Sequence, residues 1–380
     1  MHTPRILLVA GEASGDAHGA GLVAALRARA PALRFCGVGG PRMEAAGVEL
    51  LGRSEALAVV GLVEVLGHLP RVMRLFRRLT RRLRRDPPDL FVPIDAPDFN
   101  LRLAARAVRR GVPVVYFVAP QMWAWRPERA EQMRRRAREL LVLFPFEEDW
   151  FRSRGVPVTY VGHPLVDAAR ARIEGDAPAG GAAEGGLLLP GSRRSEVTRH
   201  LPALFGAVDR LQTRFPELPW TLRLADGLED SFYRRWRWPR SVRASREPIF
   251  DLAARSRVAI CASGTASFEV ALMGTPMVVV YRVSPLTWQL ARRLVRVPWV
   301  SMANLAAGEA IVPELIQSRC APQPIAAEVR ALLDDPARAQ MMRGKLTRLR
   351  EAFGPAGAYG RAAERVLAHL PDLGASPEAC

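Results

Sequence analysis

The chain has 380 residues, of which 49% are hydrophobic and 24% are charged, and its formal net charge at pH 7 is +17. This composition excludes a disordered chain, and the length favours two domains over one. The surplus of positive charge favours an anionic partner, such as a phosphorylated substrate, a nucleic acid or a membrane surface.

The four cysteines are scattered and form no CxxC pair. Neither a disulfide framework nor a zinc site is therefore predicted, and a reducing cytosol is expected. The apolar run at the start of the chain is too short for a signal peptide. No stretch of the sequence reaches the ~18 apolar residues of a membrane-spanning helix, so any membrane contact is expected to be peripheral.

The first half begins with the pattern of a Rossmann-like fold. A buried strand is predicted at residues 5–10, a glycine turn at 11–16, a helix at 17–29 and a second strand at 33–38. Ligands of such parallel sheets bind beyond the carboxyl ends of the strands. The dinucleotide fingerprint GxGxxG is absent, and no acidic residue ends the second strand, so a nicotinamide enzyme is disfavoured.

The segment between Leu57 and Arg85 is apolar at its start and rich in arginine at its end. Residues 56–66 are almost wholly apolar. Eight arginines follow, and between them apolar side chains recur at helical spacing, namely Leu69, Val72, Met73, Phe76, Leu79 and Leu83. This pattern favours a helix in a membrane interface over a core-facing helix with a solvated basic face. Nucleic acid would suit the same face, but no aromatic interleaving or recognition motif accompanies it.

Two more strand ends carry candidate chemistry. The strand at residues 90–94 ends in DAPDFN, whose two carboxylates are candidates for a general base, although either could instead cap the following helix. The strand at 112–118 leads to Trp123 and Trp125, which either offer a platform for a sugar or acyl chain or pack in the core. His163 is either a ligand contact or a structural histidine.

Residues 174–186 are rich in glycine and alanine and are predicted to form an interdomain linker or a flexible loop. The strand–helix alternation then restarts. A strand at residues 187–189 breaks at a turn that contains Ser192 and Arg193 and opens a helix. Helix N-termini present unpaired N–H groups, and a guanidinium offers a planar fork, so this turn favours phosphate.

A second loop of this type follows the strand at residues 258–261. Ser263, Gly264 and Thr265 lead into a helix, and Glu269 lies about one turn inside it. A carboxylate there can accept both hydroxyls of a ribose while the loop holds a diphosphate. Asn304 lies in another small-residue turn, with an amide predicted to be free for phosphate.

Two Rossmann-like halves with nucleotide loops in the second describe the GT-B architecture of sugar-nucleotide glycosyltransferases. The chain closely resembles lipid A disaccharide synthases in a set of motifs, namely GEASGD at 11–16, IDAPDFN at 94–100, WAWR at 123–126, LPGSR at 189–193, SGTA at 263–266, and Pro313 preceded by Asn304 and Leu305. The resemblance runs from about residue 5 to about residue 370. It implies an α/β GT-B fold of two Rossmann-like domains whose parallel sheets face a central cleft.

The implied domains are an acceptor- and membrane-binding domain at residues 1–173, which the C-terminal helix at 351–370 rejoins, a linker at 174–186, and a UDP-sugar-binding domain at 187–350. The implied reaction is the inverting transfer of 2,3-diacylglucosamine from its UDP form to 2,3-diacylglucosamine 1-phosphate, called lipid X. The products are the β-1,6-linked disaccharide 1-phosphate and UDP, in lipopolysaccharide biosynthesis.

The resemblance also implies residue roles. Asp95 resembles the general base for the acceptor 6-hydroxyl, and Arg193 resembles the residue that neutralises the departing diphosphate. The UDP pocket is carried over to Ser192, Ser263, Gly264, Thr265, Glu269 and Asn304. Acceptor contacts are expected at Glu12, Ser14, Asp98 and Trp123. No cofactor or metal is expected, because the sequence has no DxD motif, and arginine and helix N-termini can take the role of a cation.

The expected location is cytoplasmic, at the inner face of the inner membrane of a Gram-negative bacterium, with the segment between Leu57 and Arg85 docked on the anionic surface. Two alternatives stay open. One is another GT-B enzyme acting on UDP-GlcNAc, either a 2-epimerase or a muramyl-type transferase. The other is a basic nucleic-acid binder, which predicts salt-sensitive RNA retention without affinity for UDP; the leading interpretation expects no nucleic-acid partner.

Overall fold

The computed structural model describes residues 3–54, 57, 62–175 and 185–370. The chain forms two compact units, one of Met1–Pro164 with Pro355–Cys380 and the other of Leu165–Gly354. The chain therefore first passes from one unit to the other after Pro164, ahead of the domain boundary expected at residue 173. Segment 174–186 joins a helix to a strand inside the second unit and does not join the two units; its residues 176–184 lie outside the described residues.

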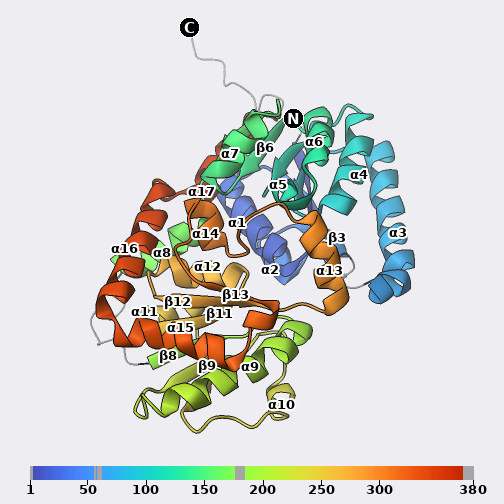
Figure 1. Cartoon of the computed structure of the whole chain (residues 1–380). Helices are drawn as coiled ribbons and strands as arrows, with labels where there is room; N and C mark the ends of the chain where they lie inside the picture. The colour runs from blue at the N-terminus through green and yellow to red at the C-terminus, as the bar shows by residue number, and fades with distance from the viewer. Residues whose placement is uncertain (1–2, 55–56, 58–61, 176–184, 371–380) are drawn as a thin grey trace. The chain divides into compact units, whose positions relative to one another are not determined.

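The first unit is built on a parallel sheet that has, within its described residues, seven strands in the order β3-β2-β1-β4-β5-β6-β7 (Figure 1). The strands are β1 (Arg5–Ala10), β2 (Arg34–Gly39), β3 (Glu49–Arg53), β4 (Leu90–Ile94), β5 (Val115–Phe117), β6 (Glu139–Val142) and β7 (Val158–Tyr160). This is the Rossmann order with one added strand, and it reverses between β1 and β4. Apart from Arg5 at the start of β1, both of these central strands are apolar and buried because helices cover the two faces of a parallel sheet.

The helices of this unit are α1 (Ala13–Arg29), α2 (Pro41–Ala45), α3 (Leu62–Arg85), α4 (Pro97–Val108), α5 (Met122–Trp125), a 3-10 turn (Pro127–Arg129), α6 (Ala130–Arg136), α7 (Pro145–Arg152) and α17 (Ala358–Leu367). The first helix begins four residues earlier than predicted, so most of GEASGD forms its first turn. The single helix expected at 351–370 is two helices: α16 ends at Ala352 in the second unit, and α17 returns to pack against α1 in the first.

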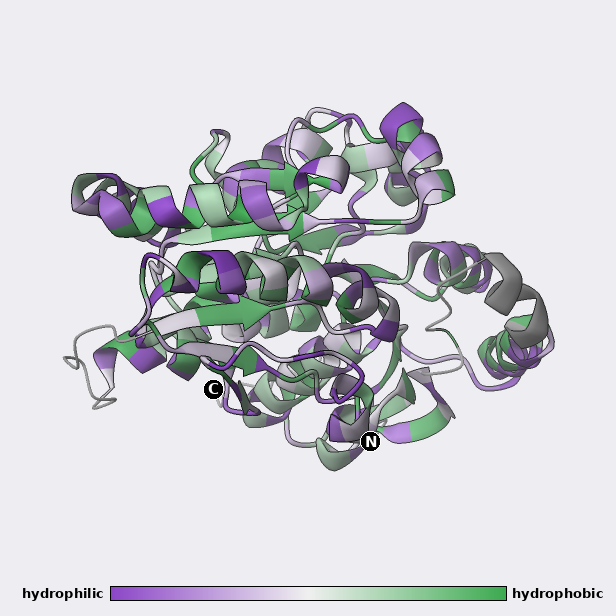
Figure 2. Cartoon of the chain, turned by 60° about the horizontal axis from the view of Figure 1, so that its bottom comes forward, coloured by the Kyte–Doolittle hydropathy of each residue, from purple (hydrophilic) through white to green (hydrophobic). Residues whose placement is uncertain are grey.

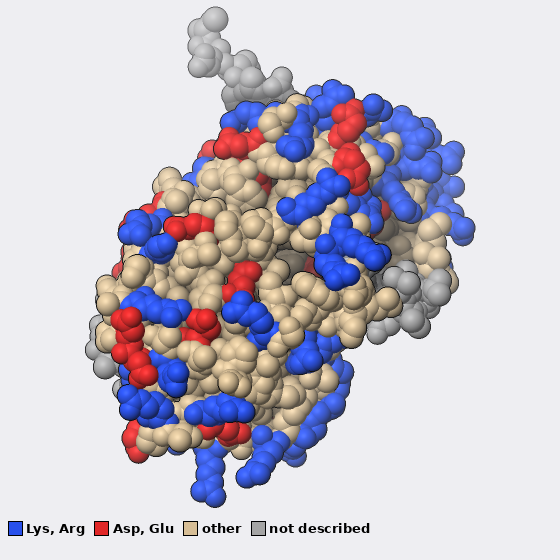
Figure 3. Space-filling model, viewed as in Figure 1, with Lys and Arg blue, Asp and Glu red and all other residues tan. Residues whose placement is uncertain are grey.

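The apolar stripe of α3, for which the sequence predicts contact with a membrane, is buried along one part of the helix and exposed along another. Leu75, Leu79 and Leu83 are buried in one cluster with residues of α4 and the sheet. Leu69 and Met73, nearer the start of the helix, are 48% and 41% exposed. Arginine side chains gather over α3 on the surface shown in Figure 3. The C-terminal half is thus a core-facing helix with a solvated basic face; residues 58–61 lie outside the described part of the chain.

The second unit repeats the architecture, with a parallel sheet of six strands among its described residues in the order β10-β9-β8-β11-β12-β13. The strands are β8 (Gly185–Leu189), β9 (Trp220–Arg223), β10 (Val242–Ser245), β11 (Ser256–Ala262), β12 (Met277–Tyr281) and β13 (Glu314–Ile316). The order reverses between β8 and β11. Figure 2 shows hydrophobic residues concentrated in the strands of the two sheets and mixed faces on the surrounding helices.

The helices of the second unit are α8 (Pro164–Glu174), α9 (Arg194–Gln212), α10 (Asp230–Tyr233), α11 (Ile249–Ala254), α12 (Thr265–Leu272), α13 (Pro285–Leu294), α14 (Met302–Ala307), a 3-10 turn (Gln317–Arg319), α15 (Pro322–Asp334) and α16 (Pro336–Ala352). Helices α9 and α15 pack together, whereas α12 packs with α11, α14 and α16. Within the described residues, no helix is long and apolar enough to cross a membrane.

Candidate active site

In each unit two of the predicted motifs follow the two strands at which the strand order reverses. In the first unit β1 is followed by the turn at residues 11–12, and β4 is followed by Asp95. In the second unit β8 is followed by residues 190–193, and β11 is followed by residues 263–265. Doubly wound sheets bind their ligands at the carboxyl ends of the strands at this reversal. Each unit therefore carries its predicted residues where a ligand is expected.

The turn after β4 has an unusual backbone. Asp95 and Ala96 both adopt left-handed conformations with φ of 47°, which is strained for residues other than glycine. The fully buried Asn100 holds the turn, because its Nδ2 donates to the carbonyl oxygen of Asp95 at 2.7 Å and also to the carbonyl oxygens at the ends of β1 and β4. The hydroxyl of Tyr116 donates to the same Asp95 carbonyl oxygen. The acid and the asparagine of DAPDFN thus belong to one hydrogen-bonded unit.

The partly buried carboxyl group of Asp95 has its pKa raised from 3.8 to about 6. Burial is the larger cause, the nearby carboxylate of Glu12 adds to it, and a hydrogen bond from the backbone of Ala96 acts in the opposite direction. A carboxylate with this pKa takes up a proton readily near neutral pH, as a general base must. Helix α4 has Ala96 at its N-cap and no side-chain cap, so neither Asp95 nor Asp98 caps it.

The turn after β1 packs against the Asp95 turn. A Cβ on Gly11 would lie 2.4 Å from the Cβ of Ala96, so only glycine fits there. Glu12 is the N-cap residue of α1, and Ser14 is exposed in the first turn of that helix. The buried carboxylate of Asp16 accepts three backbone N–H groups at the start of α2, at 2.7, 3.0 and 3.0 Å. Within this motif Asp16 is therefore structural, and Glu12 is the carboxylate beside Asp95.

Asp98 and Trp123 have partners of their own. The exposed carboxylate of Asp98 forms an ion pair with Arg129 at 2.7 Å. Trp123 is only 8% exposed, and its Nε1 donates to the carboxylate of Glu147 at 3.0 Å. Trp123 is accordingly part of the packed interior. Trp125 is the partly exposed member of the pair, and a neighbouring guanidinium lies 4.2 Å from its ring centroid.

The first unit also contains ionisable side chains whose pKa is shifted by burial, namely His18, Glu147 and His163. Of these, the sequence patterns indicated only His163. Burial lowers the pKa of His163 to about 3 and that of His18 to about 4, so both imidazoles are neutral at physiological pH. Burial also raises the pKa of Glu147 to about 7. The Nδ1 of His18 lies 3.3 Å from the hydroxyl of Tyr359 on α17. His163 is 6% exposed and packs edge-on against Phe144, as a structural histidine does.

In the second unit, Arg193 is the N-cap residue of α9, and its side chain is 50% exposed. Its Nη1 lies 3.4 Å from Oε1 of Glu196, while Oε2 of Glu196 accepts the backbone N–H groups of Ser192 at 3.0 Å and Arg193 at 3.3 Å. The Glu196 carboxylate thus holds the anion position of this helix N-terminus. A phosphate that binds here shares or replaces these contacts.

His200 joins two loops of the second unit and was not indicated by any sequence pattern. It is fully buried on α9, its Nδ1 lies 2.8 Å from the carbonyl oxygen of Pro190, and its Nε2 accepts the backbone N–H of Arg282 at 2.9 Å. These partners require a proton on Nδ1 and none on Nε2. Burial lowers the pKa of His200, which favours this neutral form. The loop that carries Arg193 is therefore tied to the loop after β12.

The loop after β11 leads into α12 through Gly264, whose φ of 151° is a conformation that glycine adopts readily and other residues rarely adopt. The Ser263 hydroxyl donates to the carbonyl oxygen of Val300 at 2.7 Å. Gly264 and Thr265 are exposed at the start of the helix. Burial raises the pKa of Glu269, on the second turn, to about 7, against the opposing effect of an arginine.

Asn304 is buried, and the prediction that its amide is free is wrong. Its Nδ2 donates to the carbonyl oxygen of Val312 and to the carboxylate of Glu314, both at 2.9 Å, and its Oδ1 accepts two backbone N–H groups at 2.8 and 2.9 Å. Glu314 also accepts the backbone N–H of Val300 at 2.9 Å. Asn304 therefore fixes the segment whose Val300 carbonyl receives Ser263. A buried polar group that bonds only within its own segment gives no sequence signal.

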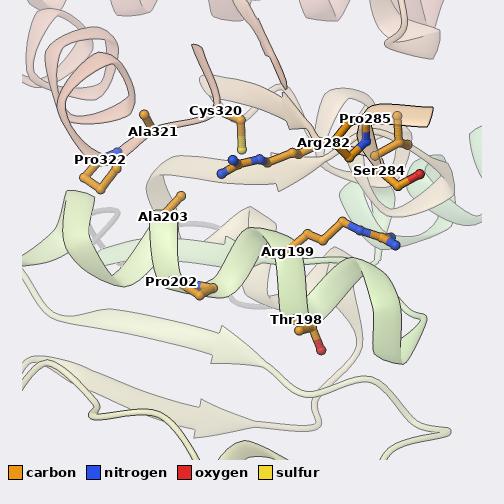
Figure 4. Close-up of a pocket in the computed structure, with 11 residues that line it drawn as sticks. Thr198, Arg199, Pro202, Ala203, Arg282, Ser284, Pro285, Cys320, Ala321 and Pro322 are labelled. Atoms are coloured by element: carbon orange, nitrogen blue, oxygen red, sulfur yellow. The ribbon is translucent and has the colours of Figure 1, made fainter. Parts of the chain in front are cut away.

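A cavity of about 550 Å³ opens beside the loop that His200 fixes. It is lined by α9, by the loop between β12 and α13, and by the start of α15, with the residues Thr198, Arg199, Pro202, Ala203, Arg282, Val283, Ser284, Pro285, Cys320, Ala321 and Pro322. In Figure 4 the side chain of Arg282 extends beneath Cys320. The side chain of Arg199 points to the side of the view on which Ser284 lies. The lining combines two guanidinium groups with apolar side chains.

No group of three or more histidine, cysteine, aspartate or glutamate residues that could hold a metal ion occurs in the part of the chain that the structure describes.

Comparison with solved structures identifies the fold. The kitacinnamycin glycosyltransferase superposes with a TM-score of 0.65 at 20% identity, covering 98% of this chain and 100% of that chain. The UDP-GlcNAc 2-epimerase from Neisseria meningitidis, solved with UDP-GlcNAc bound, gives a TM-score of 0.61 at 14% identity, covering 96% of this chain and 98% of that chain. The expected GT-B fold is confirmed.

Comparison of sequences identifies the family. The family described as lipid-A-disaccharide synthetase matches residues 6–362. The lipid-A-disaccharide synthase of Trichlorobacter lovleyi is 44% identical over 373 residues, which cover 96% of this chain and 97% of the relative. The same enzyme of Alkalilimnicola ehrlichii is 45% identical over 377 residues, which cover 96% of this chain and 98% of the relative. The resemblance seen in the motifs is confirmed, and the chain belongs to the lipid-A-disaccharide synthetase family of glycosyltransferases.

Proposed function

We propose that this chain transfers 2,3-diacylglucosamine from its UDP form to lipid X with inversion at the anomeric carbon. The acceptor 6-hydroxyl oxygen forms a bond to C1 of the donor sugar, and the bond from C1 to the diphosphate oxygen breaks. The hydroxyl proton passes to Asp95, and UDP leaves with the bonding electron pair. Attack opposite the leaving group gives the β-1,6-linked disaccharide 1-phosphate.

The observation that carries this proposal is the state of Asp95. Its carboxyl group lies at the carboxyl edge of the first sheet, on a strained turn held by Asn100, and has a pKa of about 6. A general base works best when its pKa is near the working pH, because it is then ionised yet still basic. Asp98 has an exposed carboxylate paired with arginine, which suits acceptor binding better than proton transfer.

The second unit supplies the UDP site in this proposal. Arg193 at the start of α9 neutralises charge on the leaving diphosphate, with Ser192 beside it, and Ser263, Gly264 and Thr265 bind the diphosphate at the start of α12. Glu269 accepts the ribose hydroxyls. Charge that develops on the leaving diphosphate is stabilised by such fixed donors without a metal ion. Asn304 contributes indirectly, because it fixes the segment bonded to Ser263.

The first unit supplies the membrane contact in this proposal. Leu69 and Met73 are exposed on α3 among arginines, as on helices that lie in a membrane interface. The location that follows is the inner face of the inner membrane of a Gram-negative bacterium, where an acylated donor and acceptor are available. Glu12, Ser14 and the partly exposed Trp125 are assigned to the acceptor.

The test is conversion of UDP-2,3-diacylglucosamine and lipid X by the purified protein, followed by mass spectrometry of the lipid product. Asp95→Asn is expected to abolish turnover while calorimetry shows UDP binding close to that of the unchanged protein. Asp98→Asn is the matched control and is expected to retain turnover with a raised KM for lipid X. Epimerisation of UDP-GlcNAc without disaccharide formation would instead support the 2-epimerase alternative.

A further inference from the structure

Helix α13 of the second unit exposes large apolar side chains. Leu286 is 82% exposed and Leu294 is 41% exposed, and Val295 directly after the helix is 43% exposed. Leu286 and Leu294 are separated by two helical turns and therefore lie on the same face of α13, which is orange in Figure 1. Large apolar side chains exposed on one helix face are candidates for contact with a membrane or a partner.

The charged residues on α13 and in the sequence around it are all arginines. Arg292, Arg293 and Arg296 are exposed at its C-terminal end. The sequence contains no acidic residue between Glu269 and Glu309, so no carboxylate of this stretch offsets them. Apolar side chains on one face of a helix, flanked by arginine, are the pattern of a helix that lies in the interface of an anionic bilayer.

The cavity of Figure 4 adjoins the start of this helix, because Arg282, Val283, Ser284 and Pro285 line it and lead directly into α13. Arg199 adds a second guanidinium from α9. Guanidinium groups bind phosphate oxygens in pairs, and a cavity of about 550 Å³ is within the range of small-ligand sites. An anionic headgroup with an apolar body matches both parts of the lining.

We propose that α13 and the adjoining cavity form a second lipid-contact surface, in which Leu286 and Leu294 enter the acyl region of an anionic bilayer and the two cavity arginines bind a lipid phosphate. This surface belongs to the second unit, whereas the one assigned to α3 belongs to the first, and it does not depend on the catalytic roles above. A second copy of the chain fits less well, because a two-fold interface would bring together two copies of the same positively charged surface. A protein partner fits less well too, since the cores of protein interfaces are depleted in charge.

The first test is cosedimentation of the full chain with vesicles of phosphatidylethanolamine and phosphatidylglycerol. Leu286→Ser and Leu294→Ser are each expected to lower the partition coefficient by about tenfold, the value for withdrawing much of one leucine from the bilayer. The matched control is Met341→Ser on α16, where an apolar side chain is 63% exposed away from α13, and it is expected to bind as the unchanged protein does.

The second test distinguishes the arginines of α13 from the arginine in the cavity. The double change Arg292→Ala and Arg293→Ala is expected to lower binding to these vesicles by roughly tenfold or more and to have no effect on the weak binding to phosphatidylcholine vesicles. Arg282→Ala is expected to reduce binding of short-chain phosphatidic acid below its micelle concentration, with saturating UDP present. Arg243→Ala, an exposed arginine on β10, is the control.

Several results would overturn the proposal. Unchanged vesicle binding of the α13 variants, with loss in Leu69→Ser, would assign the membrane contact to α3 alone. Removal of phosphatidic acid binding by UDP would make the cavity part of the nucleotide site, and equally tight binding of inorganic phosphate would exclude a lipid ligand. A change of oligomeric state in Leu286→Ser, seen by light scattering, would assign the surface to a second copy. Transfer activity measured in detergent micelles reports on the proposed reaction separately.

Discussion

Asp95→Asn is predicted to stabilise the protein while it removes the proposed base. In the native state burial and Glu12 hold the pKa of the Asp95 carboxyl group at about 6, against 3.8 for an ordinary aspartate. The unfolded chain ionises this group more readily than the native chain does, so ionisation favours unfolding. The penalty is absent below pH 3.8, where the group is protonated in both states, and it is complete above pH 6.

The size of the effect follows from these two values. One pKa unit corresponds to about 1.4 kcal/mol, so the native state loses about 3 kcal/mol of stability at pH 8 through this one carboxylate. The loss falls to about half that value at pH 5 and close to zero at pH 3.5. Asparagine carries no charge, tolerates the left-handed backbone at position 95, and can still accept the hydrogen bond from Ala96.

The assay is urea unfolding of Asp95→Asn and of the unchanged protein at pH 8 and pH 5, with the transition of the first unit followed. The expected gain of the variant is about 3 kcal/mol at pH 8 and about half of that at pH 5. Asp98→Asn is the control, because Asp98 is exposed and its loss removes an ion pair. A variant that is neutral or less stable at pH 8, or whose gain does not change with pH, would refute the assignment of a costly buried carboxylate at position 95.

Four further predictions follow from the described contacts. Glu12→Gln removes a charge that raises the pKa of Asp95, so the acid limb of kcat/KM against pH is expected near pH 6 in the unchanged protein and at lower pH in the variant. Arg193→Ala is expected to lower kcat by a factor that corresponds to about 3 kcal/mol, measured in the transfer assay, as for other donors to a developing charge. Asn100→Ala removes the amide donor shared by three carbonyl oxygens, of which that of Asp95 keeps Tyr116, and is expected to lower the unfolding free energy by roughly 3 kcal/mol in urea unfolding. His200→Phe is expected to weaken UDP binding by about tenfold in calorimetry, whereas His200→Gln, which can donate and accept hydrogen bonds, retains most of the affinity. Equal affinities of these two variants would show that His200 contributes only by packing.

The fold was predictable because the strands at the centre of each sheet contain apolar runs that lead into turns rich in small residues. β1, β4, β8 and β11 all have this form, and in two Rossmann-like sheets the turns after such strands gather at one edge. Local sequence therefore sufficed to place Asp95 and residues 263–265 at the carboxyl ends of the strands, where doubly wound sheets bind ligands. The motif resemblance, and not the periodicity, supplied the reaction.

The supporting residues were not predictable, because their function depends on hydrogen bonds that no local sequence pattern indicates. His200 bonds to the backbone of residue 282, and Asp16 bonds to the start of α2. Asn304 looked available in a polar turn, yet four hydrogen bonds fully occupy its buried amide. The stripe on α3 was similarly ambiguous, since an apolar helix face serves a core and a membrane equally well until burial is known.

The second unit separates the groups that hold its loops from the group proposed to act on the diphosphate. His200, Asn304 and Glu314 fix backbone positions through short bonds with buried or partly buried partners, so these loops need little reorganisation when charge develops. Arg193, by contrast, is half exposed, and its 3.4 Å pair with Glu196 is of the surface type that contributes less than about 1 kcal/mol. A diphosphate carries more charge than one carboxylate and accepts both arms of a guanidinium, so it can take Arg193 from Glu196 at small cost. Fixed backbone donors combined with an exchangeable arginine therefore suit a site that must bind a nucleotide diphosphate and release it after each turnover.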